Sequence, residues 1–178
     1  MPDFRDVFGE LLSGSSMVEI AILRIRLAAV DLSSRELKGV RRFSVLVAEA
    51  NAATIEEEAY ALTMDPGKRQ NLRRVLGLLQ TGVLEIRSAP LGGWSPDFSV
   101  FSDDVGPQNL LLGLHWFHRP FPHRGPAWAA RFGPTEAKRA RERFRTLWDG
   151  AHQIGPAVQK LMERTSLRGC SGPRRFRS

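Results

Sequence analysis

The sequence has very little cysteine and no long apolar run, and these two absences exclude several classes of protein. Cys170 is the only cysteine among 178 residues, so no disulfide can form within the chain and a small secreted disulfide scaffold is excluded. No apolar stretch approaches the ~20 residues of a membrane span. The first residues also lack the basic-then-apolar order of a signal peptide. We therefore expect a cytoplasmic protein with no membrane span.

The common mechanistic motifs are absent as well. The sequence contains no GxxxxGK[ST] phosphate loop, no GxGxxG dinucleotide fingerprint and no GxSxG nucleophile elbow. Cys170 lies in a stretch rich in Gly, Ser and Pro, where no positioned base is expected, and this argues against cysteine catalysis. The sequence therefore predicts no cofactor.

Positive charge is concentrated in the second half of the chain, whose formal net charge is +7. Residues 1–90 contain 12 basic and 12 acidic residues, whereas residues 91–178 contain 14 basic and 7 acidic residues. The last eleven residues hold four of these charges, at Arg168, Arg174, Arg175 and Arg177. Such an excess favours an anionic partner, DNA or RNA above all. A solvated basic surface that aids solubility explains it about equally well.

Apolar patterns alternate between strands and capped helices. The predicted strands cover residues 17–27, 43–48, 83–87, 97–102 and 110–117, the last two forming a hairpin. A helix is predicted from Asp65 to a glycine terminator at Gly82. Capping boxes at Ser33–Glu36 and Thr54–Glu57 predict two further helix starts.

The end of the chain is predicted to be helical and amphipathic. The longest helical pattern starts at Pro134 and runs to about Arg164, with a break at Gly155-Pro156. The order of elements predicts the α/β class, a mixed β-sheet flanked by helices with a long C-terminal amphipathic helix. We divide the chain into an N-terminal segment over 1–16, with a loop before the first strand, one domain over 17–165, and a basic, disordered tail over 166–178.

The densest group of candidate site residues follows the last predicted strand. Three histidines and two arginines fall within ten residues, at His115, His118, Arg119, His123 and Arg124. Histidine can act as a nucleophile or general acid/base, and arginine grips phosphate oxygens with two donors, so this group favours phosphate binding. A proline-rich rim whose histidines only form hydrogen bonds is the competing interpretation. A metal site is not predicted, because the spacing of the histidines does not make them converge.

The predicted final helix carries a second basic group. Its polar face is expected to hold Lys138, Arg139, Arg141, Arg143 and Arg145, opposite an apolar stripe that includes Phe144 and Trp148. These cations are candidates for contacts with nucleic acid. A solvated helix laced with salt bridges explains the pattern equally well.

Two sequence stretches give the chain a family resemblance. The strand GVLEIR, which ends at Arg87, and the helix pattern FxxLWxxA over 144–151 resemble the core of phospholipase D-like domains, over about residues 17–152. The resemblance implies a single phospholipase D-like α/β domain. Catalysis in that superfamily uses an HxKx4D signature followed by GSxN, in which the histidine forms a phosphohistidine. Domains with one copy of the signature commonly pair, which implies a homodimer or a larger assembly.

The signature is not intact in this chain. With Asp103 on the aspartate of the motif, Pro96 and Phe98 take the places of the histidine and lysine; with Asp104 there, Asp97 and Ser99 do. On the following strand only Gly113 matches, with His115 or Trp116 near the asparagine. Without this nucleophile, catalysis is expected to fall by several orders of magnitude.

The functional expectation is therefore a catalytically degenerate domain rather than an enzyme. It would bind an anionic ligand or nucleic acid, or act as a partner subunit, with Arg87 and the His115–Arg124 group near the ligand. The alternative is a phosphodiesterase or nuclease that uses His115 or His118 as a displaced nucleophile.

Overall fold

A computed structural model of the chain describes residues 4–23, 37–48, 69–89, 97–113 and 129–170, which form one mixed sheet and four helices. The strands are β1 (Met17–Ile22), β2 (Arg42–Val47), β3 (Leu84–Ser88), β4 (Phe98–Ser102), β5 (Pro107–Gly113), β6 (Ala129–Phe132) and β7 (His152–Gln153). The helices are α1 (Phe4–Ser13), α3 (Arg69–Gln80), α4 (Pro134–Asp149) and α5 (Gly155–Cys170). The α/β class predicted from the sequence is confirmed.

The seven strands lie in the order β6-β5-β4-β1-β2-β3-β7. β1, β2 and β3 are parallel, whereas β4 runs antiparallel to both β1 and β5. β5 therefore points the same way as β1, and the carboxyl ends of β1, β2, β3 and β5 lie at one edge of the sheet. The predicted β4–β5 hairpin is confirmed, although β5 begins at Pro107 rather than at residue 110.

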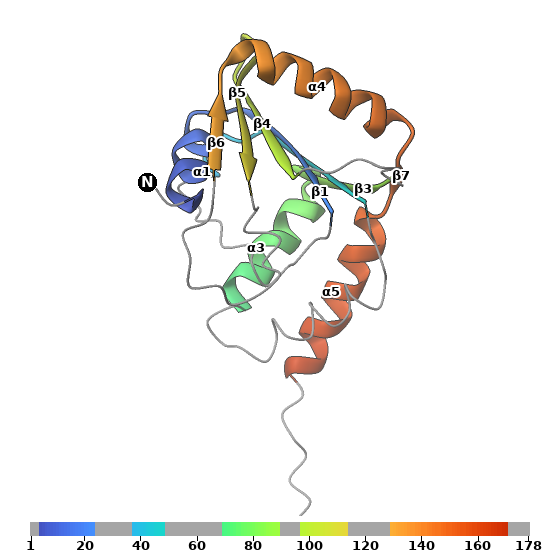
Figure 1. The fold of residues 1–178 in the computed structure, drawn as a ribbon. Helices are drawn as coiled ribbons and strands as arrows, with labels where there is room; N and C mark the ends of the chain where they lie inside the picture. The colour runs from blue at the N-terminus through green and yellow to red at the C-terminus, as the bar shows by residue number, and fades with distance from the viewer. Residues whose placement is uncertain (1–3, 24–36, 49–68, 90–96, 114–128, 171–178) are drawn as a thin grey trace, which may run out of the picture.

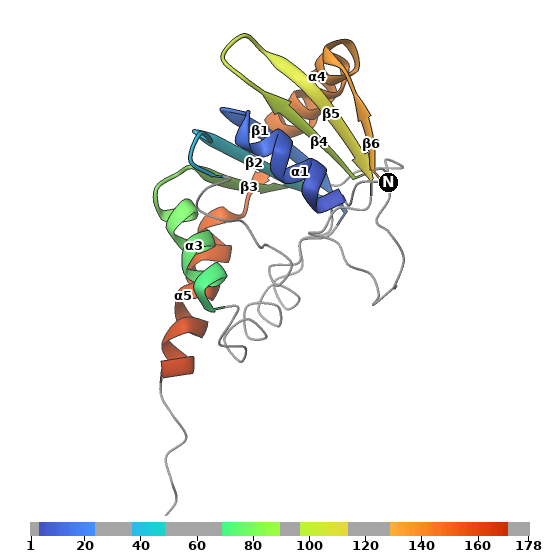
Figure 2. The ribbon, with the colours of Figure 1, turned by 90° about the vertical axis from the view of Figure 1, so that its left-hand side faces the viewer.

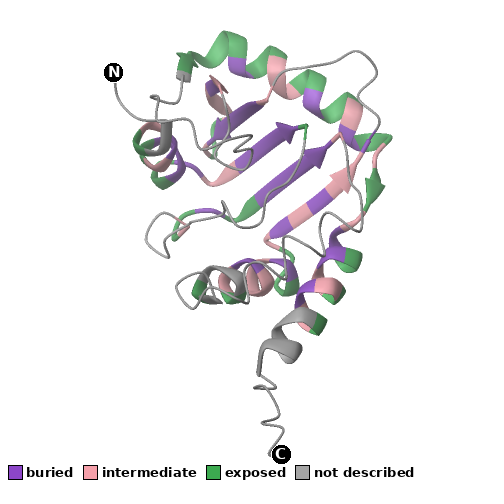
Figure 3. Ribbon diagram, turned by 60° about the horizontal axis from the view of Figure 1, so that its bottom comes forward, coloured by how far each residue is buried: buried purple, intermediate pink, exposed green. Residues whose placement is uncertain are grey.

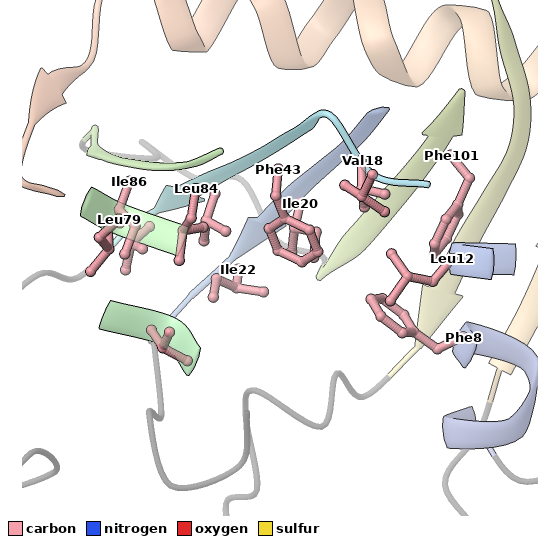
Figure 4. Close-up of a cluster of buried hydrophobic side chains, with 14 of the residues drawn as sticks. Phe8, Leu12, Val18, Ile20, Ile22, Phe43, Leu79, Leu84, Ile86 and Phe101 are labelled. Carbon is pink, nitrogen blue, oxygen red and sulfur yellow. The ribbon is translucent and has the colours of Figure 1, made fainter. Parts of the chain in front are cut away.

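Three helices and a continuous apolar core cover one face of the sheet. Alternate residues of β1, Val18, Ile20 and Ile22, point to this side and are buried. They pack with side chains of α1, α3 and α5, and Figure 4 shows this row running from Ile86 to Phe8. Phe8 and Phe101 meet edge to face with ring centroids 5.2 Å apart. This face is the main hydrophobic core.

A single helix, α4, covers the opposite face (Figures 1 and 2). Its buried residues Ala137, Phe144 and Trp148 form a second apolar cluster with Ala21, Leu46, Ala89, Phe98, Val100 and Leu110 of the strands and their ends. Figure 3 shows buried strands between the layers and the exposed outer surface of α4. One helix is too narrow to cover a seven-stranded face, so part of this face carries polar residues.

The structure differs from the sequence prediction at α1. Residues 4–13 form a helix in the segment for which only a loop before the first strand was predicted. Phe8, Leu11 and Leu12 recur at helical spacing and are buried against the sheet. Gly9 is tolerated inside this helix because the apolar contacts outweigh its cost of about 1 kcal/mol.

The helical region after Pro134 is interrupted earlier than predicted. α4 ends at the Gly150 cap, and the two-residue strand β7 pairs with β3 before α5 begins at Gly155. Pro156 lies in the first turn of α5, where its missing N–H needs no partner, so Gly155-Pro156 starts a helix instead of breaking one. α5 also includes residues 166–170, which the sequence assigned to the tail.

Several predicted features lie outside the described residues, namely both capping boxes and residues 171–178 of the tail. Within the described residues, Gly82 follows α3 at φ +71°, the left-handed conformation expected of a helix terminator. None of the helices in these parts of the chain combines the length and apolarity that crossing a bilayer requires.

The packing of Phe101 predicts a large effect on stability. Its ring is fully buried between the sheet and α1, so Phe101→Ala should lower the free energy of unfolding by about 3–5 kcal/mol through lost burial and a cavity. Urea denaturation followed by circular dichroism measures this loss. Val105→Ala is the control, because Val105 lies in the turn of the same hairpin and is 90% exposed; a similar loss in both variants would contradict the proposed packing.

Candidate functional site

The histidine and arginine group predicted from the sequence lies outside the described residues. This applies to His115, His118, Arg119, His123 and Arg124. β5 ends at Gly113, at the edge formed by the carboxyl ends of β1, β2 and β3. Ligands of open α/β sheets commonly bind outside this edge, so the predicted group follows a strand that ends at a favourable place.

Arg87, the remaining residue of that prediction, is held by groups within the protein. Its Nε and Nη2 donate to Glu85 Oε1 at 2.9 and 2.7 Å, and its Nη1 donates to the carbonyl of Trp148 at 3.1 Å. The guanidinium also lies 4.6 Å from the centroid of the Trp148 ring, a cation–π contact. Arg87 therefore fastens the end of α4 to β3, and most of its donors are already used.

The residues that the resemblance aligns with the histidine and lysine of the phospholipase D-like signature lie before and at the start of β4. Phe98 and Ser99 are buried, and Asp97 accepts a hydrogen bond of 3.0 Å from the backbone N–H of Leu23. Residues 97–113 contain neither histidine nor lysine. The described part of the hairpin thus offers no phosphohistidine nucleophile and no lysine beside it.

Helix α4 carries the second basic group predicted from the sequence. Lys138, Arg139, Arg143 and Arg145 are exposed, in agreement with the expected polar face. Arg141 differs, because its side chain is only 14% exposed and points toward the sheet. It therefore does not belong to the exposed basic face of the helix.

Arg141 pairs with a buried carboxylate on the central strand β1. Arg141 Nε lies 3.0 Å from Glu19 Oε2, and the Glu19 side chain is 6% exposed. Among the described residues neither atom has a well-aligned hydrogen-bond partner, so we treat the contact as an ion pair with a poorly directed N–H. Burial raises the pKa of Glu19 above its ordinary value, and the nearby charges of Arg141, Arg145 and Arg42 only partly oppose this effect.

Glu19 belongs to a polar row that crosses the sheet beneath α4. The strand register places Ser44 of β2 beside Glu19, and Glu85 of β3 beside Ser44. Arg42, two residues before Ser44, lies with Nη2 3.6 Å from Glu85 Oε2. Together with Arg141 and Arg87, these residues form a charged network between α4 and the sheet.

The sequence analysis missed the acidic members of this network. Glu19 stands inside the apolar strand MVEIAI, and Glu85 and Arg87 are two residues apart in LEIRS, a spacing that puts both on one face of a strand. An acidic residue in the middle of a buried strand was an available signal, since it needs a buried partner. No group of three or more metal-ligating side chains occurs among the residues that the structure describes.

The Glu19–Arg141 pair predicts an asymmetric response to mutation. Arg141→Met should lower the free energy of unfolding by about 3 kcal/mol at pH 7, because it leaves a buried carboxylate without its partner. The double variant Glu19→Leu/Arg141→Met should recover much of this loss. Denaturant titration measures both. The matched control is Arg139→Met on the exposed side of α4; if it costs as much as Arg141→Met, the pair has no special role.

The raised pKa of Glu19 predicts a pH dependence. The folded chain binds a proton at Glu19 more tightly than the unfolded chain, so this group stabilises the fold most below its ordinary value of 4.5. Its contribution is lost as the pH rises through the higher pKa of the folded state. The stability of the natural chain minus that of Glu19→Gln should therefore fall between pH 4.5 and pH 7, as measured by urea denaturation at each pH. A constant difference would contradict the assignment.

The sequence matches no model of a known protein family, and no curated protein is significantly similar to it.

Proposed function

We propose that the chain is a non-catalytic, phospholipase D-like domain that binds nucleic acid through the exposed face of α4. The observation that carries this proposal is the set of free cations on that helix. Among the described residues, Lys138, Arg139, Arg143 and Arg145 are exposed and none forms a close ion pair. Phosphate groups are the natural partners of such cations, and neutralising them releases counterions.

The anchoring of α4 favours binding because it fixes the cations before the ligand arrives. Phe144 and Trp148 stack with ring centroids 5.3 Å apart in the cluster that holds the helix on the sheet. Arg139 and Arg143 are four residues apart, so their backbone positions are separated by about 6 Å along the helix axis. A rigid helix loses little conformational entropy on binding.

The charge on α4 supports weak, sequence-independent binding. The helix has five basic and three acidic residues, Glu136, Glu142 and Asp149, and Arg141 is already paired with Glu19. This small excess fits contacts to the phosphate backbone, which typically give dissociation constants of about 10⁻⁴–10⁻⁶ M at physiological salt.

Nuclease or phosphodiesterase activity remains the alternative proposal. Its support is the sequence group that contains His115 and His118, together with the end of β5 at the edge where the parallel strands finish. The lack of histidine and lysine in residues 97–113 argues for the binding function.

The salt dependence of binding tests the proposal. A 20-nucleotide duplex DNA and a single-stranded RNA of equal length, each labelled with a fluorophore, are titrated at several salt concentrations and followed by anisotropy. For the duplex, Arg139→Gln/Arg143→Gln should reduce the slope of log K against log salt by about 1.8, because two phosphate contacts are lost. It should also weaken binding at low salt.

The control variant is Arg73→Gln/Lys160→Gln, which removes the same charge from α3 and α5 on the other side of the sheet. Both control positions are exposed. The proposal would be contradicted if both double variants weakened oligonucleotide binding equally, or if the natural chain did not bind either oligonucleotide at low salt. The nuclease alternative would be favoured if the natural chain cleaved either oligonucleotide in metal-free buffer and His115→Ala did not.

A further inference from the structure

Three arginines, Arg42, Arg141 and Arg145, lie near enough to Glu19 for their charges to act on it, on the side of α4 that faces the amino ends of β1 and β2. Arg87 of β3 lies next to them, bound to Glu85. We call Arg42, Arg87, Arg141 and Arg145 the arginine cluster. Arg141 lies 3.6 Å from the sulfur of Met17, the first residue of β1, and the register places Met17 beside Arg42, the first residue of β2. Arg145 follows Arg141 by one helical turn. On the other flank of the buried face of α4, toward the carboxyl ends of β1 and β2, the contacts are apolar: Ala140 and Leu147 pack on the second apolar cluster.

Two members of the arginine cluster form close ion pairs with carboxylates, and the other two do not. Arg141 is paired with Glu19, and Arg87 donates to Glu85 and to the carbonyl of Trp148. Among the described residues the Arg42 side chain has only one ionic contact, the long one of 3.6 Å to Glu85, and it is 54% exposed. Arg145 is exposed and, among the described residues, forms no close ion pair. Arg42 and Arg145 therefore keep free donors at the open side of the network.

The charges of this network do not balance. Four guanidinium groups face two carboxylates, Glu19 and Glu85, which lie about 10 Å apart because Ser44 of the intervening strand separates them. Even with both carboxylates ionised, two positive charges remain beside a partly buried surface. In such surroundings an anion is attracted more strongly than in bulk water.

We propose that the arginine cluster binds a phosphate group, held between Arg42 of β2 and Arg145 of α4. Guanidinium is suited to this ligand, because its planar donors match two phosphate oxygens at once. Arg141 and Arg87 lie beneath and contribute charge, while their carboxylate partners fix the position of the cluster. A phosphate dianion would neutralise the excess of two charges.

This site shares Arg145 with the proposed nucleic-acid surface, but it also needs Arg42 of β2, so each proposal can fail without the other. The site lies at the amino ends of β1 and β2. The predicted histidine group follows β5, which ends at the opposite edge of the sheet, where the parallel strands have their carboxyl ends. The ligand chemistry is a phosphate monoester or free phosphate, whereas a nucleic-acid backbone offers singly charged diesters.

Isothermal titration of the full chain with inorganic phosphate, in low-salt buffer at pH 7.5, tests the site. Saturable binding is expected, and Arg42→Gln/Arg145→Gln should weaken it at least tenfold. The matched control, Arg139→Gln/Arg143→Gln, removes equal charge from the same helix at positions away from the cluster and should change the affinity less than twofold. A third variant, Arg42→Lys/Arg145→Lys, keeps the charge but loses the paired donors, and should bind with intermediate affinity.

The outcomes separate this inference from the proposed function. Phosphate binding that depends on Arg42 and Arg145 supports the site even when the oligonucleotides do not bind. Absence of saturable phosphate binding up to millimolar concentrations, or equal losses in the Arg42/Arg145 and Arg139/Arg143 variants, would overturn the site even if the oligonucleotides bind α4. Circular dichroism of each variant verifies the fold, and because Arg42 and Arg145 are exposed we expect no change.

A deoxynucleoside monophosphate, compared with the same deoxynucleoside without its phosphate, distinguishes the source of the phosphate. Tighter binding of the phosphorylated form that is lost in Arg42→Gln/Arg145→Gln identifies a phosphomonoester ligand. Binding of inorganic phosphate alone identifies the free anion, and either result supports the site. If neither ligand binds, the proposal is wrong.

Discussion

The ion pair between Glu19 and Arg141 sets the orientation in which helix α4 lies on its face of the sheet. Three helices seal one face of the sheet with an apolar core, whereas the other face has α4 alone. A lone helix covers only a strip of this face, so the strands carry buried residues under the helix and partly exposed residues beside it. Glu19 lies in that strip, on the central strand, and its carboxylate is acceptable there because Arg141 reaches down to it.

This arrangement gives α4 two different sides. Toward the carboxyl ends of the strands it packs on Phe98, Ala89 and Leu46, and toward the amino ends it presents arginines to Glu19 and Glu85. The apolar side supplies most of the free energy that holds α4 on the sheet, since burial of large side chains contributes about 1.5–3 kcal/mol each. The ionic side adds less net energy, and we infer that it fixes the rotation of the helix about its axis. Rotating α4 by a third of a turn would bury Lys138 or Arg145 without a partner.

The sequence predicted elements whose signals are local. The buried strands β1 and β2, the β4–β5 hairpin and the terminator Gly82 follow from apolar runs, a polar turn and a glycine at a helix end. The two-residue strand β7 has no such signal, because its existence depends on the backbone of β3 beside it. The same holds for Pro156, whose role as helix starter depends on where α4 stops.

The candidate site was less predictable than the fold, because its charged residues come from separate elements. Arg141 looked like one more cation on a polar helix face, and only the position of β1 beneath it shows that it is paired. Arg42 and Arg145 are 103 positions apart in the chain, so no sequence motif joins them. Glu19 carried a signal that the sequence prediction did not use, since a lone acid within MVEIAI needs a buried counter-charge.

The composition of residues 97–113 and the arginine cluster bear on the proposed function through the same physical argument. A phosphoryl-transfer site needs a nucleophile together with cations, and residues 97–113 supply neither histidine nor lysine. Cations without a nucleophile can still bind phosphate, since affinity depends on charge and donor geometry alone. In the described residues the cations of the arginine cluster stand on α4, β2 and β3, and carboxylates hold two of them, Arg141 and Arg87, in place. The charge and donor geometry of this network therefore favour the proposed binding of phosphate.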